Sequence, residues 1–167
     1  MTPFHFEHDF RAASIADVLV AYFDPELSAE HDRLSGIARR EELERDDTPA
    51  RLVRVHRVFP ERQLPVFVRP FVSGPLTYTE RLVFDRAADR IDLDIRPSVL
   101  GKRTQIRITY ALTQPAPGVV RRVYEGDVTV EIALVGGRAE RMIVDDIGKV
   151  LETVVPCTQE WLDAHPR

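Results

Sequence analysis

Four polar residues occupy positions where the sequence pattern calls for apolar ones, and they are the first candidates for chemistry. His8 alternates with three phenylalanines, Glu80 lies between a tyrosine and a leucine of the same parity, and Arg122 shares the parity of Tyr124. Glu140 falls within the apolar stripe of a C-terminal helix. Because a polar residue on an apolar face is more informative than an exposed apolar one, we expect all four to point into the interior.

Such a set could act as a polar cluster at one end of an internal cavity and orient the head group of a ligand. A buried glutamate beside a histidine could also serve as a general acid or base, since burial raises the pKa of a carboxyl group towards neutrality. The alternative is structural: the four residues form satisfied internal pairs, or lie at strand ends in water. Perturbed groups mark functional sites only statistically, so the three interpretations stay open.

Three tyrosines, Tyr78, Tyr110 and Tyr124, share the inward face. A tyrosine in a cavity wall offers an apolar ring and a hydroxyl that can orient a ligand, although each could equally be a core residue bonded to the backbone. The five histidines show no metal-ligand spacing, so we expect neither a metal nor a cofactor. Cys157 is expected to be a small packed hydrophobe rather than a nucleophile.

The elements that would position these residues begin with a strand and two short helices. Residues 4–10, FHFEHDF, alternate strictly, as a half-buried strand does. A capping-box pattern at Ser14 predicts a helix over residues 15–24, which ends before a proline. Residues 26–34 predict a second short helix.

Period-two alternation follows, which indicates antiparallel strands. A charged edge strand is expected over residues 37–45, and further strands over residues 51–59, 76–85, 91–96, 104–113 and 119–134. Strand 51–59 places Val53, Val55 and Phe59 on one face. The apolar face of the last strand is predicted to hold Tyr124, Val128, Val130, Ile132 and Leu134, with a bulge or bend at Gly126.

Residues 60–75 carry four prolines, which excludes a central strand. The apolar residues between the prolines include Phe67 and Phe71. An apolar loop of this length should lie over an apolar surface, so we expect it to act as a lid whose phenylalanines touch a ligand.

The run from Gly136 to Leu162 has the spacing of a long amphipathic helix with one wide apolar stripe. Pro156 interrupts it, because proline lacks the amide and clashes with the carbonyl four residues earlier. We expect the packed helix to span about Arg138 to Val155, with a bent continuation in which Trp161 plugs the far end.

Composition narrows the function classes. The chain has 167 residues with a formal net charge of −4, which argues against a dedicated nucleic-acid binder. One cysteine excludes an intramolecular disulfide. No apolar run approaches the roughly 20 residues that span a bilayer. The N-terminus also lacks a signal-peptide pattern, so we expect a cytoplasmic protein without integral membrane contact.

The order of elements, the FHFEHDF opening, the strand SGPLTYTERLVFD and the run LVGGRAERMI before the terminal helix resemble the START-like (SRPBCC, helix-grip) superfamily. Within it the sequence is most similar to an uncharacterised bacterial family. The resemblance implies an α+β fold, with a curved antiparallel sheet of about seven strands around a long C-terminal helix. It covers residues 1–167 as one START-like domain, and it implies a hydrophobic cavity between sheet and helix.

The function expected from this reasoning is non-covalent binding of a hydrophobic small molecule, a lipid or a polyketide-like compound. The contacts would come from His8, Tyr78, Glu80, Tyr110, Arg122, Tyr124, Glu140, Phe67 and Phe71. One alternative is an enzyme like the polyketide cyclases and aromatases, with His8, Glu80 or Tyr110 as acid–base groups. Another is an interaction module whose core is filled by its own side chains. The sequence indicates no oligomeric state.

Overall fold

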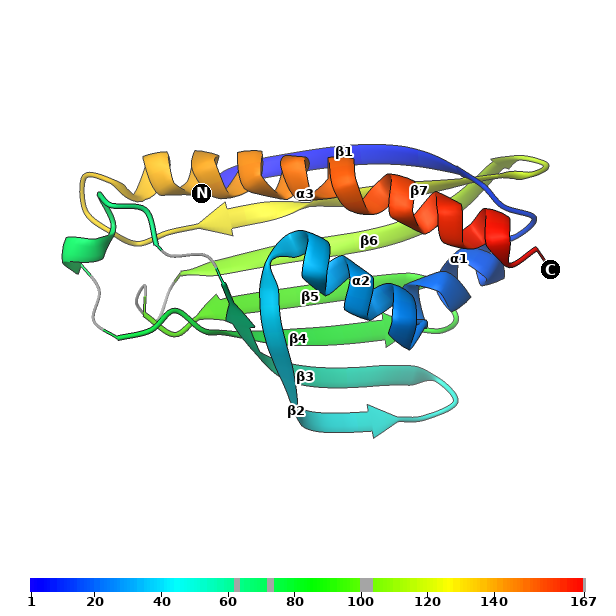
Figure 1. The fold of residues 1–167 in the computed structure, drawn as a ribbon, viewed down its shortest axis with the longest axis horizontal. Coiled ribbons are helices and arrows are strands. Elements are labelled where there is room, and N and C mark those ends of the chain that lie inside the picture. The colour runs from blue at the N-terminus through cyan, green and yellow to red at the C-terminus, as the bar shows by residue number, and fades with distance from the viewer. Residues whose placement is uncertain (62–63, 72–73, 100–103, 167) are drawn as a thin grey trace.

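The structure is a computed structural model that describes residues 1–61, 64–71, 74–99 and 104–166. A curved antiparallel sheet wraps around one side of a long helix, and two short helices lie in its open side (Figure 1). The elements in chain order are β1 (Thr2–Arg11), α1 (Ile15–Phe23), α2 (Pro25–Ser35), β2 (Ile37–Asp47), β3 (Arg51–Pro60), the 3-10 turn η1 (Arg69–Phe71), β4 (Tyr78–Asp85), β5 (Arg90–Pro97), β6 (Gln105–Ala116), β7 (Val119–Thr129) and α3 (Gly136–Ala164).

The seven strands pair in the order β1-β7-β6-β5-β4-β3-β2, and every pair is antiparallel. Strands β2 to β7 form a meander, in which each strand pairs with the next one along the chain. The first strand returns to pair with the last, with Thr2 opposite Val128 and Arg11 opposite Val119. This arrangement confirms the predicted helix-grip architecture.

The inward faces of β1, β4, β5 and β6 follow the predicted alternation. Phe10, Phe84, Ile91 and Tyr110 are all buried in one core cluster. Directly opposite residues of an antiparallel pair lie on the same face of the sheet. The inward-facing residues of one strand therefore determine which residues of the neighbouring strand face inward. Burial of each such large side chain contributes about 1.5–3 kcal/mol.

Local hydrogen bonds explain why α1 and α2 begin and end where they do. Asp17 donates its backbone N–H to Ser14 Oγ at 3.3 Å, and its carboxylate accepts the Ser14 N–H at 3.0 Å. This is the predicted capping box. Asp24 caps α2 by accepting the Leu27 N–H at 2.8 Å. Gly36 ends α2 with a φ of 67°, a conformation that glycine adopts at little cost.

Helix α3 runs without interruption through Pro156, so the expectation that the packed helix stops near Val155 is wrong. The apolar stripe continues past the proline, and Thr158 and Leu162 are buried like Leu151 before it. Packing of that stripe outweighs the loss of one backbone hydrogen bond. The C-terminal half of α3 slopes towards α1 and α2 (Figure 1). Trp161 is half-buried there and stacks on His165 with ring centroids 4.2 Å apart.

Strand β7 is shorter than predicted and ends at Thr129. Leu134, which was expected on the apolar face, is fully exposed in the turn before α3 and has a φ of 70°. The pairing of β7 with β1 and β6 shows no shift at Gly126, so the predicted bulge is absent from this described strand. The glycine is needed for another reason: a Cβ there would lie 1.8 Å from the Arg107 carbonyl oxygen.

The face of β3 that joins the inward face of β4 consists of Leu52, Arg54, His56 and Val58. Val53, Val55 and Phe59, which the sequence grouped as the apolar face, lie on the other side of the sheet. The edge strand β2 has two register shifts, between Ile37 and Arg39 and between Glu42 and Glu44. These shifts reset its alternation, so the parity of its side chains does not follow from the sequence.

The described residues of the proline-rich segment after β3 form turns and η1 rather than a strand, as expected. It lies beside the N-terminal end of α3, whereas α1 and α2 lie along the C-terminal half (Figure 1). Val68 is buried in the core, and the Arg138 guanidinium lies 4.4 Å from the centroid of the Phe67 ring. The side chain of Phe71 falls outside the described part of the structure.

Candidate functional site

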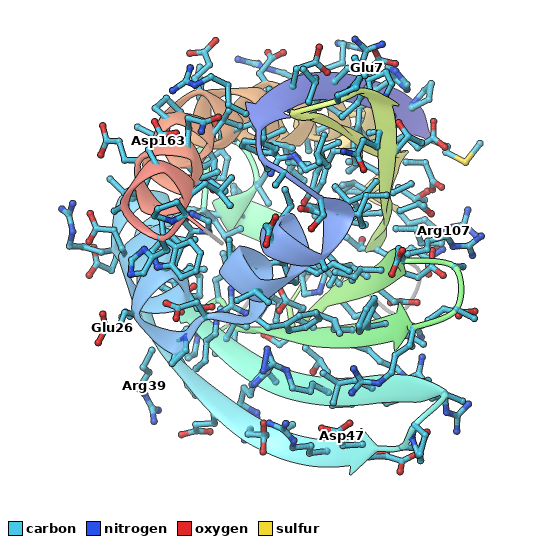
Figure 2. The ribbon with its side chains drawn as sticks, turned by 90° about the vertical axis from the view of Figure 1, so that its right-hand side faces the viewer. Glu7, Glu26, Arg39, Asp47, Arg107 and Asp163 are labelled. Carbon is cyan, nitrogen blue, oxygen red and sulfur yellow. The ribbon has the colours of Figure 1, made fainter. Side chains whose placement is uncertain are left out.

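A cavity of about 200 Å³ lies between the concave face of the sheet and the helices. The end-on view shows the sheet curving around this interior, with Glu7, Asp47 and Arg107 pointing away from it (Figure 2). The cavity is lined by Val18, Tyr22, His31, Ser35, Arg40, Glu80, Leu93, Tyr110, Arg122, Tyr124, Val150, Leu151, Val154 and Thr158.

Arg122 is the charged residue buried deepest in this cavity wall, with 5% of its surface exposed. It lies on β7 opposite His8 of β1 and Leu112 of β6, away from either edge of the sheet. Its Nη2 donates to His8 Nδ1 at 3.1 Å, and its Nε is buried without a hydrogen-bond partner. The guanidinium also lies 5.1 Å from the ring centroid of Phe10 and 5.6 Å from that of Tyr110.

The contact with Arg122 determines the protonation state of His8. Arginine carries donors only, so His8 Nδ1 must be the acceptor and the imidazole must be neutral at this atom. Partial burial and the neighbouring Arg122 charge both lower the pKa of His8 below its ordinary value. His8 is therefore a hydrogen-bonded neutral side chain at neutral pH.

The opposite wall of the cavity holds a three-residue ion network. Arg40 of β2 donates through Nε to Asp32 of α2 at 2.9 Å and through Nη1 to Glu80 of β4 at 2.6 Å. Burial disfavours the charge of Arg40, but Glu80 and Asp32 together raise its pKa. Glu80 thus faces the cavity, as the sequence predicted, but its carboxylate is already paired with Arg40.

His31 and Thr158 link α2 to α3 at the cavity. The Thr158 hydroxyl donates its one hydrogen to the Val154 carbonyl at 2.8 Å and lies 3.1 Å from His31 Nε2. The histidine must therefore be the donor, with its proton on Nε2. Burial, and then the Arg122 charge, lower the pKa of His31.

Two of the three predicted tyrosines line the cavity. Tyr110 and Tyr124 do so, and Tyr22 of α1 joins them with its ring centroid 4.9 Å from that of Tyr110. Burial raises the pKa of both Tyr110 and Tyr124, and the positive charge of Arg122 opposes that rise. Tyr78 lies on the inward face of β4 outside the lining set, where burial and Glu80 raise its pKa to about 12.

Glu140 lies apart from the cavity that Glu80 and Arg122 line, and His8 is linked to that cavity through Arg122. Glu140 is buried at the start of α3, where it accepts hydrogen bonds from the Val130 N–H at 3.0 Å and the Thr2 hydroxyl at 2.8 Å. The α-amino group of Met1 lies 2.9 Å from the same carboxylate. Burial alone would raise the pKa of Glu140, but these donors lower it. The structure therefore places it as an anchor between α3 and the β1–β7 edge.

The lid residue Phe67 also lies away from this cavity. Phe67 packs against the core but is not among the lining residues. The half-buried Cys157 does not line the cavity either, and burial raises the pKa of its thiol.

Sequence reasoning missed Asp32, His31, Arg40 and two further inward polar residues of β3. His31 has a signal, since it follows Leu27 by four residues and so lies on the same helical face. Arg40 has none, because the register shifts of β2 hide its orientation. Arg54 and His56 were hidden by the wrong face assignment of β3. Each has a buried nitrogen without a partner, Nε in Arg54 and Nδ1 in His56.

A larger hollow of about 330 Å³ lies on the outer face of β4 to β7. Four of its charged lining residues form ion pairs: Arg107 with Asp127 at 3.1 Å, Asp94 with Arg96 at 2.8 Å, and Asp92 with Arg90 at 2.8 Å. We therefore take the interior cavity, with its unpaired buried arginine, as the candidate site.

No helix in the described part of the chain is both long and apolar enough to cross a membrane. The described residues also contain no group of three or more His, Cys, Asp or Glu side chains arranged to hold a metal ion.

The sheet, the gripped helix and the cavity between them define the START-like helix-grip fold. Solved structures with this fold superpose on nearly the whole chain. A Thermus thermophilus protein has a TM-score of 0.67 at 15% identity, with 98% of both chains covered. A START superfamily protein from Mycobacterium smegmatis has a TM-score of 0.61 at 13% identity, with 97% of both chains covered. A Streptomyces aromatase/cyclase has a TM-score of 0.52 at 14% identity, with 96% of this chain and 92% of that chain covered.

The chain belongs to the family described as "Protein of unknown function (DUF2505)", which matches residues 5–162. Among curated proteins, none matches the sequence.

Proposed function

We propose that this protein binds a small organic molecule in the cavity between the sheet and α3. The observation that carries the proposal is the cavity itself, whose wall combines a majority of apolar and tyrosine side chains with a few polar groups held in place by defined partners. That combination is typical of small-molecule sites. The START-like fold supports it, because the solved structures that share the fold include an aromatase/cyclase.

The volume limits the size of the ligand. Drug-sized ligands occupy pockets of roughly 300 Å³ or more, whereas an apolar cavity of about 150 Å³ holds benzene. A cavity of about 200 Å³ fits one ring with a short side chain, or a short alkyl chain. We therefore propose a ligand smaller than the lipid or polyketide-like compound that the sequence suggests.

We favour binding over catalysis because the candidate acid–base groups are held in separate pairs. Glu80 accepts from Arg40, and His8 accepts from Arg122. Within the described residues, no hydrogen bond or ion pair joins His8 to Glu80. The open volume in turn favours a ligand over an interior filled by the protein's own side chains.

Calorimetric titration with small apolar compounds tests the proposal. Hydrocinnamate, octanoate and their primary amides are suitable probes, since each is one ring or one chain with a polar end. We expect at least one of these four compounds to bind saturably, with one molecule per protein chain. Native mass spectrometry of protein purified from its own host should show a bound compound of similar size.

Two matched variants of α3 locate the site. Val150→Trp places a large ring in the cavity and should abolish binding, whereas Glu152→Trp places the same ring on the exposed face and should not. Val150→Phe is the milder variant if the tryptophan prevents folding, which circular dichroism would reveal. Absence of binding by every probe at millimolar concentration, or binding that survives both Val150 substitutions, would overturn the proposal.

A further inference from the structure

Arg122 is a buried cation that makes no ion pair within the described part of the chain. Its partners are the neutral imidazole of His8, the rings of Phe10 and Tyr110, and the Tyr110 hydroxyl, none of which carries a negative charge. A buried charge costs several kcal/mol of desolvation unless an opposite charge and further hydrogen bonds compensate it. The position on β7, with paired strands on both sides, prevents the side chain from reaching bulk water at a sheet edge.

The acidic residue across the cavity does not meet this need. Glu80 is held at 2.6 Å by Arg40, which also binds Asp32. This network consists of two carboxylates and one guanidinium, and none of its hydrogen bonds involves Arg122. The free hydrogen-bonding capacity of Arg122 includes Nε, which is buried and has no partner.

The geometry of the unpaired N–H groups of Arg122 favours a carboxylate as the ligand group. A guanidinium presents its N–H groups as a planar fork that matches the two oxygens of a carboxylate. The walls around it supply ring faces from Tyr110 and Tyr124 and the apolar side chain of Leu151. An acid with a compact apolar body meets both the charge and the surface of this cavity.

We propose that the ligand is a small organic acid whose carboxylate binds Arg122 and whose apolar part fills the remaining cavity. This inference rests on the proposed function, that the cavity binds a small molecule. Arg122 would act as the specificity-determining residue. The Asp32–Arg40–Glu80 network would hold the opposite wall and disfavour a second negative charge there.

The test compares each acid with its amide, hydrocinnamate with hydrocinnamamide and octanoate with octanamide, by calorimetric titration. Wild-type protein should bind the acid about 10- to 100-fold more tightly, as expected for charge-assisted hydrogen bonds. Arg122→Gln should remove that preference while leaving the affinity for the amide within about two-fold. Arg121→Gln is the matched control, since Arg121 lies on the outer face of the same strand paired with Asp9, and it should leave the preference for the acid unchanged.

A measurement on the wild-type protein covers the case in which Arg122→Gln does not fold. The charge of Arg122 contributes to the lowered pKa of His8. A bound carboxylate neutralises that charge, so the acid should raise the pKa of His8 in an NMR titration and the amide should not.

The outcomes separate the two proposals. Equal binding of acid and amide by the wild-type protein would overturn the inference and leave the proposed function standing. So would an unchanged pKa of His8 in the saturated complex with the acid. Failure of every probe to bind would instead overturn the proposed function itself.

Discussion

At the scale of single residues, the two buried charges that the sequence singled out have opposite surroundings. Glu140 is surrounded by donors from Val130, Thr2 and the N-terminus. Arg122 lies opposite a neutral histidine and keeps an unpartnered nitrogen. The first arrangement is complete without a ligand and the second is not, which is why we assign a structural role to one and a binding role to the other.

Glu140→Ala should destabilise the protein without affecting the cavity. It leaves the Val130 N–H buried without a partner, which costs about 1–3 kcal/mol of unfolding free energy. Urea denaturation measures this loss, and Glu152→Ala on the exposed face of the same helix should change stability by less than about 0.5 kcal/mol. If Glu140→Ala weakened ligand binding by more than the measured loss of stability can explain, Glu140 would belong to the binding site.

At the scale of elements, Gly126 allows β7 to pack closely against β6. A Cβ at this position meets the Arg107 carbonyl oxygen at 1.8 Å, and backbone cannot move aside as a flexible side chain can. Gly126→Ala should therefore lower the unfolding free energy by about 3 kcal/mol or more. Gly137→Ala is the control, since its nearest atom is the end of the Arg141 side chain at 3.7 Å and its effect should stay within about 0.5 kcal/mol. Equal stability of the two variants in thermal unfolding would contradict this account.

Helix α3 tolerates Pro156 because the stripe on either side of it is packed. Pro156→Ala restores an amide that can donate to the Glu152 carbonyl, and the proline itself is exposed. We expect the free energy of unfolding to rise by about 1–3 kcal/mol. Glu160→Ala, an exposed substitution on the same helix, controls for helix propensity. A decrease with Pro156→Ala would mean that the proline geometry is required to seat Thr158 and Leu162.

At the scale of the whole molecule, the interior of the fold disfavours the protonated form of its histidines. Burial is the first cause of the lowered pKa values of His8, His31 and His56. In the unfolded chain these groups titrate near the ordinary value of 6.5, so below that pH the unfolded state binds more protons than the folded state. Stability should therefore fall as the pH drops below about 6.5, and level off once the pH is below the folded-state pKa values.

Urea denaturation across about pH 7.5 to 5.5 checks this pH dependence. His31→Gln should make the fall shallower, because it removes one of the three partly buried histidines. His5 has the opposite effect, since the hydrogen bonds that its ring donates to Glu7 and then Glu125 raise its pKa, but it is exposed and solvent screens it. A stability that rises on acidification would contradict the assignment of neutral buried histidines.

The sequence by itself determined the order of elements, the meander and the inward parity of most strands. Alternation and helical periodicity are local signals, and in β1, β4, β5 and β6 no register shift reverses them within the inward-facing part. The same signals found His8, Glu80, Tyr110 and Arg122 as inward residues.

Only the tertiary structure decided which of these residues meet. The register shifts of β2 turned Arg40 inward to neutralise Glu80, and the start of α3 took Glu140 to the β1–β7 edge. Arg122 was left facing the cavity without an anion. Periodicity specifies the face on which a side chain lies, but the partner across that face depends on how distant segments pack.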